Sequence, residues 1–338
     1  MKTSQKGADI SLQNQAWICS EFGDYQNLEL KHIAIEEPEA GQLLVENECI
    51  SLGFPDLLMI KGKYQLKPQL PFVPGSEFCG RVIQTVSKNP KFPIGSMVIG
   101  SVRFGASAKY VIALESDCIG LPSRLSVEEG AAFLVAYKTA YVGLVMRGGL
   151  KAGEKVLVLG ASGGVGMAAV NLAKSLGARV FAAVSSESKR EAILKKGADH
   201  TIIVTQEDLR DNVKALTDGI GVDVVFDPVG GKLFDEALRC LSPLGRLLVI
   251  GFASGKIPSI SVNYALIKQL SIIGVRAGEF GRLNPEDGYQ VMSELAALLQ
   301  SEDIKPEVHT SLDWNSLKQA FSLIEKREVV GRATVFCR

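Results

Sequence analysis

A glycine-rich segment at residues 160–166 has the residue types and spacing of a phosphate-binding turn. It follows a run of branched apolar residues, 156–159, that predicts a buried strand, and it precedes an alanine-rich run, 167–176, that predicts a helix. Glycine lets backbone amides approach a pyrophosphate without a Cβ in the way, and a helix start offers unpaired N–H groups. With a second strand predicted at 179–184, the segment indicates a dinucleotide-binding unit.

The end of that second strand indicates which dinucleotide is preferred. An NAD-selective site has an acidic side chain about 20 residues after the glycines. Here Ser185 and Ser186 stand at that place, and Lys189 and Arg190 follow. Hydroxyl donors and a cation suit a 2′-phosphate, which predicts NADPH. The alternative is a solvated helix start, in which Glu187 would repel the phosphate.

The elements that must position these residues fall into two patterns. The first pattern, from about residue 16 to 121, predicts a β-rich barrel-like or sandwich unit with strands at 43–50, 80–86, 97–101 and 108–113. The second, from about residue 128, alternates strands with helices, as in a doubly wound parallel sheet. Its strands are expected at 155–159, 179–184, 201–204, 222–227, 245–250 and 270–275. Helices are expected at 189–196, 209–217 and 232–240.

The last part of the chain predicts helices at 285–300 and 314–326 and a strand at 333–336. The nucleotide-binding sheet is complete before them, so we expect these residues to return to the first unit. The predicted fold is therefore α/β with one discontinuous domain, residues 1–127 and 278–338, and a dinucleotide-binding domain, residues 128–277. The substrate is expected between the two, beyond the carboxyl ends of the parallel strands.

Composition excludes several classes of protein. The 338 residues are 46% apolar and carry no formal net charge, so nothing indicates disorder or attraction to nucleic acid or an anionic membrane. Met1 to Gln15 hold no apolar run of signal-peptide length, and we expect a cytoplasmic protein. The six cysteines form no Cys-x-x-Cys pair, which argues against a zinc ribbon and for buried, inert thiols.

Several collinear motifs resemble the zinc-free medium-chain dehydrogenase/reductases of the quinone oxidoreductase (zeta-crystallin-like) type. The resemblance covers nearly the whole chain and implies a GroES-like catalytic domain joined to a Rossmann-type domain. Besides the glycine-rich turn, the motifs lie at 54–56, 62–64, 71–77, 137–141, 227–231, 251–252 and 330–332.

The resemblance implies which residues bind the cofactor. In the turn formed by Gly160, Ser162, Gly163, Gly164, Val165 and Gly166, the amides of residues 163–165 would face the pyrophosphate. Ser185, Ser186 and Lys189 would bind the adenine-ribose end, and Gly251 and Phe252 would lie along the nicotinamide. Thr139 would contact the nicotinamide side, unless its hydroxyl bonds its own helical turn. Gly331 and Arg332 would close over the cofactor, unless Arg332 is a surface charge.

The motif at 75–77 indicates chemistry without a metal. Related alcohol dehydrogenases have a zinc-binding histidine where this chain has Ser76, and the cysteines of their structural zinc site are missing. We therefore expect hydride transfer from NADPH to a quinone or an α,β-unsaturated carbonyl. Tyr64 would donate a hydrogen bond to the acceptor oxygen, although a packing role is the alternative. The chain also departs from the family, because Gly53 replaces an asparagine and Leu58 a tyrosine seen in some quinone reductases.

Two further interpretations stay open. Arg276 follows the last predicted strand of the sheet and would bind a carboxylate or a thioester-linked phosphate, or else pair with Glu279 or Glu286 on the surface. The first would favour a 2-enoyl thioester reductase, and a non-catalytic NADPH-binding protein is a third possibility. The only partner expected besides the small-molecule acceptor is a second copy of the chain, as in dimeric relatives, with residues 259–273 near the interface.

Overall fold

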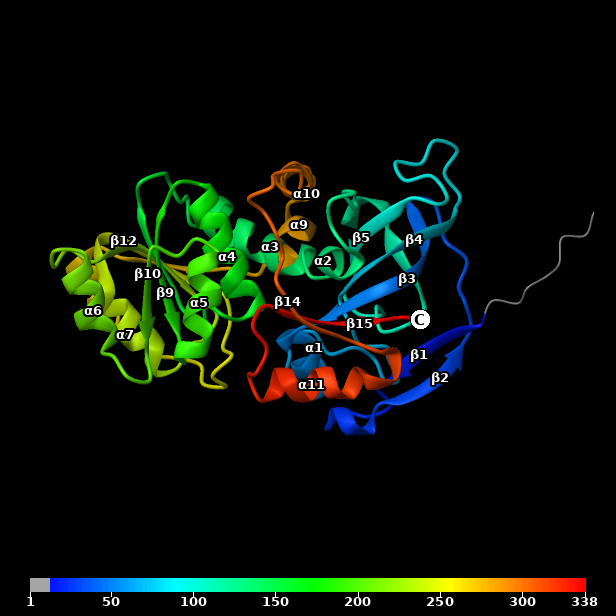
Figure 1. Ribbon diagram of the computed structural model, residues 1–338, viewed down its shortest axis with the longest axis horizontal. Coiled ribbons are helices and arrows are strands. Elements are labelled where there is room, and N and C mark those ends of the chain that lie inside the picture. The colour runs from blue at the N-terminus through cyan, green and yellow to red at the C-terminus, as the bar shows by residue number, and fades with distance from the viewer. Residues whose placement is uncertain (1–12) are drawn as a thin grey trace, which may run out of the picture.

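A six-stranded parallel sheet forms the half of the molecule that begins near residue 155 (Figure 1). In the computed structural model, which describes residues 13–338, its strand order is β10-β9-β8-β11-β12-β13. The order reverses between β8 and β11, and this switch point is where such sheets bind dinucleotides. The strands are β8 (Lys155–Val158), β9 (Arg179–Val184), β10 (His200–Ile203), β11 (Val222–Asp227), β12 (Leu241–Val249) and β13 (Ser271–Gly274).

Helices cover both faces of this sheet, which explains why its inner strands are mostly apolar. Figure 1 shows α4 and α5 on one side and α6 and α7 on the other. The helices are α4 (Gly164–Ser175), α5 (Glu187–Lys195), α6 (Leu209–Leu216), α7 (Lys232–Cys240) and α8 (Asn263–Lys268). Each crossover is therefore the β-α-β unit that the alternating sequence pattern predicts.

The other half is built on a mostly antiparallel sheet of order β14-β15-β3-β4-β5-β7, with β6 paired to β3 and with β1 and β2 paired separately. The strands are β1 (Asn14–Ile18), β2 (Glu29–Ile33), β3 (Gln42–Leu52), β4 (Glu77–Thr85), β5 (Met97–Ser101), β6 (Tyr110–Leu114), β7 (Cys118–Gly120), β14 (Val308–Leu312) and β15 (Arg332–Phe336). Because β15 pairs with β3, the end of the chain lies in this sheet.

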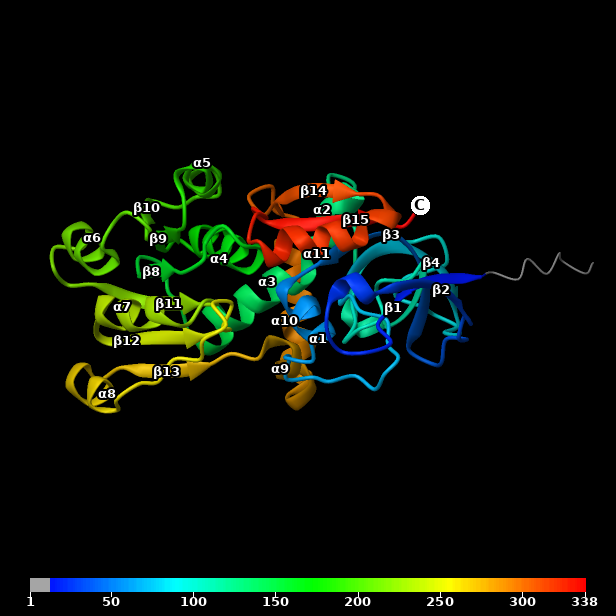
Figure 2. The ribbon, with the colours of Figure 1, turned by 90° about the horizontal axis from the view of Figure 1, so that it is seen from below.

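The remaining helices lie around this sheet and between the two halves (Figure 2). They are α1 (Phe54–Ile60), α2 (Val127–Ala131), α3 (Leu134–Tyr141), a π-helical turn (Val142–Arg147), α9 (Ala277–Leu283), α10 (Pro285–Leu298) and α11 (Leu317–Glu325). Short 3-10 turns occur at Tyr25–Asn27, Glu115–Asp117 and Trp314–Ser316.

The α/β fold class is confirmed, and the structure differs from the sequence-based prediction only locally. Strand β12 begins four residues before the expected position, because Leu241 already pairs with Val222 across an irregularity in the ladder. Strand β14 was not predicted, since its side chains are all partly or fully exposed and give no apolar alternation. All six cysteines are buried and free.

Hydrogen bonds tie the two halves together where the chain returns from the parallel sheet. The Tyr137 hydroxyl donates to Asn171 Oδ1 (2.7 Å), and Asn171 Nδ2 donates to the carbonyl of Asp303 (2.9 Å). Arg124 donates to three carbonyls of the segment 299–304. The returning segment is thus fixed to both halves by polar contacts, of which the one between Tyr137 and Asn171 is buried.

In the part of the chain that the structure describes, every helix is too short or too polar to cross a lipid bilayer. The expectation for Met1 to Gln15 falls mostly outside the described residues, which begin at 13.

Candidate active site

The glycine-rich turn joins β8 to α4 and uses its glycines in different ways. Gly160 has a φ of +57°, and a Cβ on Gly166 would lie 2.3 Å from the Gly160 carbonyl oxygen. At Gly163, by contrast, a Cβ would meet nothing closer than 3.6 Å. Gly160 and Gly166 close the turn tightly against the helix, whereas Gly163 leaves the backbone open on its outer side.

The amides at the start of α4 can hold a pyrophosphate. The Gly163 amide donates to the Gly160 carbonyl (3.0 Å) and is therefore used within the turn. The Gly164 amide takes part in the parallel bridge between Gly163 and Gly331, whereas the Val165 amide has no hydrogen-bond partner among residues 13–338, as expected of the first turn of a helix. Since α4 is 12 residues long, both amides lie at the positive end of a substantial helix dipole.

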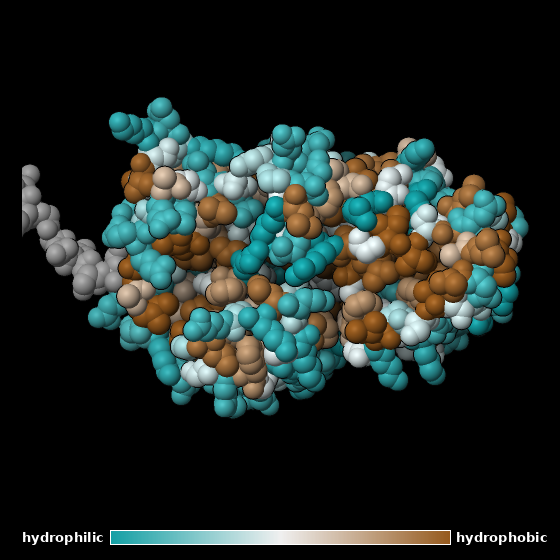
Figure 3. Space-filling view, turned by 180° about the vertical axis from the view of Figure 1, so that it is seen from behind, coloured by the Kyte–Doolittle hydropathy of each residue, from teal (hydrophilic) through white to brown (hydrophobic). Residues whose placement is uncertain are grey.

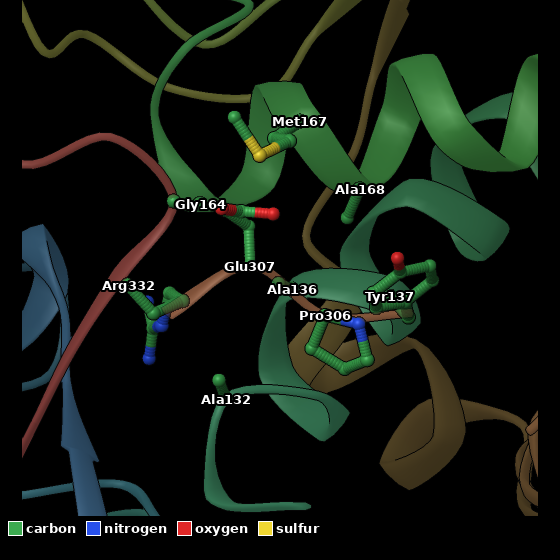
Figure 4. A pocket seen from close by; sticks show the side chains of 10 residues that line it. Ala132, Ala136, Tyr137, Gly164, Met167, Ala168, Pro306, Glu307 and Arg332 are labelled. Carbon is green, nitrogen blue, oxygen red and sulfur yellow. The ribbon is translucent and has the colours of Figure 1, made fainter. Parts of the chain in front are cut away.

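The inner side of this turn faces the other half of the molecule. The Gly331 amide donates to the Ser162 carbonyl (2.8 Å), which attaches the start of β15 to the turn. Figure 4 shows Gly164, Met167 and Ala168 of this region opposite Arg332 and Glu307, around a cavity of about 10 Å³. A cavity of this size holds at most one water molecule, so a dinucleotide must bind on the open side of the turn.

The end of β9 brings a cation to a serine. Lys189 Nζ donates to Ser185 Oγ (3.1 Å) and to the carbonyl of Arg327 (3.0 Å). Burial, and to a lesser extent Arg327, lowers the pKa of Lys189 from its usual value. Ser186 lies next to them as the residue before α5, and its hydroxyl contacts Ser188. A cation and hydroxyls therefore meet where the ribose 2′ position lies in this fold.

The two neighbouring charges are placed differently. Arg190 pairs with Glu207 (2.9 Å) and with Glu187 (3.5 Å), so the structure does not bring it to Ser185. The ion pair with Arg190 partly neutralises Glu187, which weakens the repulsion expected between this carboxylate and a 2′-phosphate. Of the two cations in the motif, Lys189 is the one available to a phosphate.

Arg327 is a candidate site residue that the sequence did not reveal. It follows α11 with a φ of +59°, and its guanidinium donates to the carbonyl of Ala253 (2.9 Å). It thus links Lys189 at one end of the cofactor-binding edge to the loop after β12 at the other. Because it lies 138 residues from Lys189 in sequence, no local pattern indicated this role.

The loop after β11 is held by a buried carboxylate and lies beside the loop after β12, which carries Gly251 and Phe252. Asp227 at the end of β11 accepts hydrogen bonds from the amides of Val229 (2.7 Å) and Gly230 (2.8 Å). Burial raises the pKa of Asp227, and these two hydrogen bonds oppose the shift. The loop after β12 is joined to the loop after β11 by a hydrogen bond from the Ala253 amide to the Pro228 carbonyl.

Thr139 lies on α3, and its hydroxyl donates to the Val135 carbonyl (2.7 Å). This is the alternative that the sequence left open, in which the threonine bonds its own helical turn. The oxygen keeps its capacity to accept a hydrogen bond, so a cofactor contact stays a prediction.

Arg332 is buried at the start of β15, so its interpretation as a surface charge is wrong. It forms an ion pair with Glu77, and its Nε donates to Ser51 Oγ (2.9 Å). Burial lowers the pKa of Arg332 to about 10, against the stabilising charge of Asp56. The guanidinium is therefore charged at neutral pH and is committed largely to buried protein partners.

Asp56 and Ser76 occupy the region where related dehydrogenases bind zinc. The buried Asp56 carboxylate accepts from the Gly53 amide (2.8 Å) and contacts the Ser76 hydroxyl, while burial raises its pKa. A Cβ on Gly53 would lie 2.7 Å from Arg332 Nη1, so an asparagine there would displace the guanidinium. Within residues 13–338, His, Cys, Asp and Glu form no group of three or more that could hold a metal.

Tyr64 follows α1 in the first half of the molecule, and Arg276 precedes α9. Tyr64 is half-buried against the core of the first half, and burial together with the Asp56 charge raises its pKa. The charges of Arg276 and Arg282 act in the opposite direction on the pKa of Tyr64. Arg276 itself is largely exposed and lies 4.0 Å from Glu279, the surface pairing foreseen for it.

Fold and site together define a two-domain oxidoreductase with a nicotinamide-nucleotide site. Residues 39–123 match the family model of the alcohol dehydrogenase GroES-like domain, and residues 164–297 match the family model of zinc-binding dehydrogenases. A quinone oxidoreductase-like protein 2 homologue from Nematostella vectensis is 34% identical over 324 residues, which are 95% of this chain and 88% of the relative. The chain belongs to the medium-chain dehydrogenase/reductase family, among the quinone oxidoreductase-like proteins.

Two solved structures extend the comparison. A mycobacterial protein in complex with NADPH has a TM-score of 0.87 at 28% identity, covering 96% of this chain and 99% of that chain. The CurK enoyl reductase has a TM-score of 0.88 at 25% identity, with the same coverage. The fold thus occurs both in a protein that binds NADPH and in an enoyl reductase.

Proposed function

We propose that the protein is an NADPH-dependent, metal-independent reductase that transfers hydride to a quinone or an α,β-unsaturated carbonyl. The observation that carries the cofactor assignment is the contact of Lys189 with Ser185 at the carboxyl end of β9. A cation and a hydroxyl there match a 2′-phosphate, and positions 185 and 186 have no carboxylate to accept a hydrogen bond from the 2′-hydroxyl of NAD. The NADPH complex of a structural relative supports the same choice.

The residues fit the proposed cofactor at three places. The amides of Gly164 and Val165, of which the second is free, would bind the pyrophosphate, Lys189 with Ser185 and Ser186 the 2′-phosphate, and Gly251 with Phe252 the nicotinamide. When bound there, NADPH supplies the hydride for an electron-poor carbon of the acceptor.

The protein's own contribution is to position the acceptor and stabilise charge on its oxygen. Tyr64 would donate a hydrogen bond from its hydroxyl to that oxygen as negative charge develops. Its raised pKa keeps the proton on the hydroxyl at neutral pH. The proton that completes the reduction then comes from Tyr64 or from solvent.

Metal independence is supported by the chemistry of the side chains at the zinc position. Ser76 has no imidazole nitrogen, and the carboxylates nearest to it, Asp56 and Glu77, are engaged with Gly53, Arg332 and Val135. Without a Lewis acid an alcohol is a poor hydride donor, whereas quinones and enones accept hydride readily.

A 2-enoyl thioester reductase is the second candidate. It is favoured by the exposed guanidinium of Arg276 near Tyr64 and by the similarity to an enoyl reductase. The deciding experiment is a panel of 1,4-naphthoquinone, a simple enone and crotonyl thioester, each with NADPH. Turnover of the quinone or enone on the order of 1 per second supports the proposal. Turnover of the thioester alone supports the second candidate, and no acceptor-dependent oxidation supports a non-catalytic binding protein.

We also propose a homodimer and the domain boundaries 1–127 with 278–338 and 128–277. Strand β13 is at the edge of its sheet, and the apolar side chains of Val262, Leu266 and Ile267 beside it are largely exposed. Figure 3 shows apolar side chains gathered over the end of the molecule where α8 and β13 lie. Such an edge and such a patch together favour pairing with a second copy.

A further inference from the structure

Three guanidinium groups surround one carboxylate of helix α9. Glu279 Oε1 lies 2.5 Å from Arg282 Nη1, 3.7 Å from Arg103 Nη2 and 4.0 Å from Arg276 Nη2. Arg276 and Arg282 belong to the start and end of α9, whereas Arg103 follows β5 in the other half of the molecule. The cluster therefore has an excess of two positive charges.

Two of the three arginines retain free donors. Only Arg282 is within hydrogen-bonding distance of Glu279, and in the described chain neither Arg103 nor Arg276 donates a hydrogen bond to any other group. A guanidinium has five N–H donors arranged to match a carboxylate or phosphate. Uncompensated cations held side by side repel one another, so an anion that binds between them relieves this repulsion.

The cluster lies beside the group proposed to contact the acceptor oxygen. Arg276, Glu279 and Arg282 all influence the pKa of Tyr64. Figure 2 shows α9 where the two halves of the molecule meet. Figure 3 shows hydrophilic side chains gathered at the middle of the same face, between two apolar areas.

We propose that Arg103, Arg276 and Arg282 bind an anionic group, a carboxylate or a phosphate, of the acceptor whose carbonyl reaches Tyr64. This inference rests on the proposed reductase function and narrows its substrates to anion-bearing acceptors. A neutral quinone then serves as an acceptor but leaves the cluster without a ligand. Lys138 is a nearby cation that does not belong to the site, because it is mostly buried and pairs with Asp117 (3.8 Å).

The test compares matched anionic and neutral acceptors at saturating NADPH. The carboxylate pair is 4-oxo-2-pentenoate and its methyl ester, and the phosphate pair is crotonyl-coenzyme A and crotonyl N-acetylcysteamine. The measured quantity is the ratio of kcat/KM for the anionic member to that for the neutral member. We expect Arg276→Ala to lower this ratio about five- to tenfold, a modest factor because the guanidinium is partly screened by solvent.

Two variants separate charge at the site from general effects. Arg276→Lys retains the charge and should keep part of the preference. Arg210→Ala removes an equally exposed arginine from α6, outside the site, and should leave the ratio unchanged. As a readout without turnover, the carboxylate product 4-oxopentanoate should bind the NADP⁺-loaded protein by calorimetry, and more weakly to the Arg276→Ala variant.

The outcomes are distinguishable from failure of the reductase function. If Arg276→Ala lowers the kcat/KM ratio for the carboxylate pair alone or for the phosphate pair alone, the inference is supported and the anion is identified. Equal efficiencies within both pairs, or a ratio that Arg276→Ala does not alter, overturn it even if neutral acceptors are reduced. If no acceptor is reduced, the reductase function fails, and unaltered 4-oxopentanoate binding in Arg276→Ala then overturns the anion site as well.

Discussion

The guanidinium of Arg332 and the carboxylate of Glu77 form an ion pair in which both side chains are almost completely buried. The pair joins the start of β15, near the end of the chain, to the start of β4. Glu77 also accepts a hydrogen bond from the Val135 amide at the start of α3 (2.8 Å), and α3 leads into the nucleotide-binding half. One carboxylate therefore connects three segments that are distant in sequence.

Removing the charge of Glu77 should destabilise the protein. We expect Glu77→Gln to lower the free energy of unfolding by about 3 kcal/mol, because Arg332 is then a buried charge without its partner. Both tryptophans, Trp17 and Trp314, lie in the core of the first half, so their fluorescence during urea unfolding reports on this region. Glu325→Gln, which breaks the exposed pair with Lys61, is the control and should cost less than about 1 kcal/mol. Similar losses in both variants would contradict the structural role of the buried pair.

Lys189 should determine the preference between the two nicotinamide cofactors. Lys189→Ala removes the cation that would contact the 2′-phosphate, and we expect it to weaken NADPH binding about tenfold, with little change for NADH. Dissociation constants from fluorescence titration with both cofactors provide the measurement. The matched control is Lys195→Ala, on the exposed side of the same helix, where the lysine pairs with Glu191. Equal losses for NADPH and NADH in Lys189→Ala would refute the 2′-phosphate assignment.

Tyr64→Phe should lower turnover and leave NADPH affinity unaltered. The lost hydroxyl is the proposed donor to the acceptor oxygen, and a single such donor contributes roughly 10²-fold or more to kcat. Because burial and Asp56 raise the pKa of Tyr64 above its usual value, the wild-type hydroxyl keeps its proton to a higher pH than a free tyrosine does. The alkaline decline of kcat should therefore have its midpoint above the pKa of a free tyrosine and be absent from the variant. Wild-type rates with every acceptor would leave Tyr64 with a packing role alone.

Removal of metal ions should not affect the reaction. Since Ser76 and its buried neighbours provide no imidazole or thiolate ligands, dialysis against a chelator should leave kcat and KM as they were. The assay is acceptor-dependent NADPH oxidation before and after dialysis, with metal content measured in parallel. A loss of activity that zinc restores would show that metal independence is incorrect.

The apolar surface of α8 should hold two copies of the chain together. Leu266→Glu introduces a charge into the proposed interface, and we expect the mass measured by light scattering to fall from that of two chains to that of one. Ile94→Glu alters another largely exposed apolar side chain, between β4 and β5, and serves as the control. A wild-type protein that is monomeric at all concentrations would exclude the dimer.

The sequence alone determined the features that depend on neighbouring residues. The strand–turn–helix pattern at 155–176 is set by apolar runs and glycines that act locally, and the structure has β8, the turn and α4 there. The alternation of strands and helices fixed the α/β class for the same reason, because each crossover is encoded within about 30 residues. The contact between Ser185 and Lys189 could also be foreseen from the sequence, since these two residues lie four positions apart at the start of one helix.

Only the tertiary structure decided the roles that depend on residues distant in sequence. The burial of Arg332 depends on Glu77 and Ser51, more than 250 residues earlier in the chain, so no local pattern could distinguish it from a surface charge. Arg327 reaches Lys189, and Arg103 reaches Glu279, only because the chain returns to its first sheet after completing the second. Long-range pairing of charges is a property of the packed molecule, and a linear pattern of residue types does not contain it.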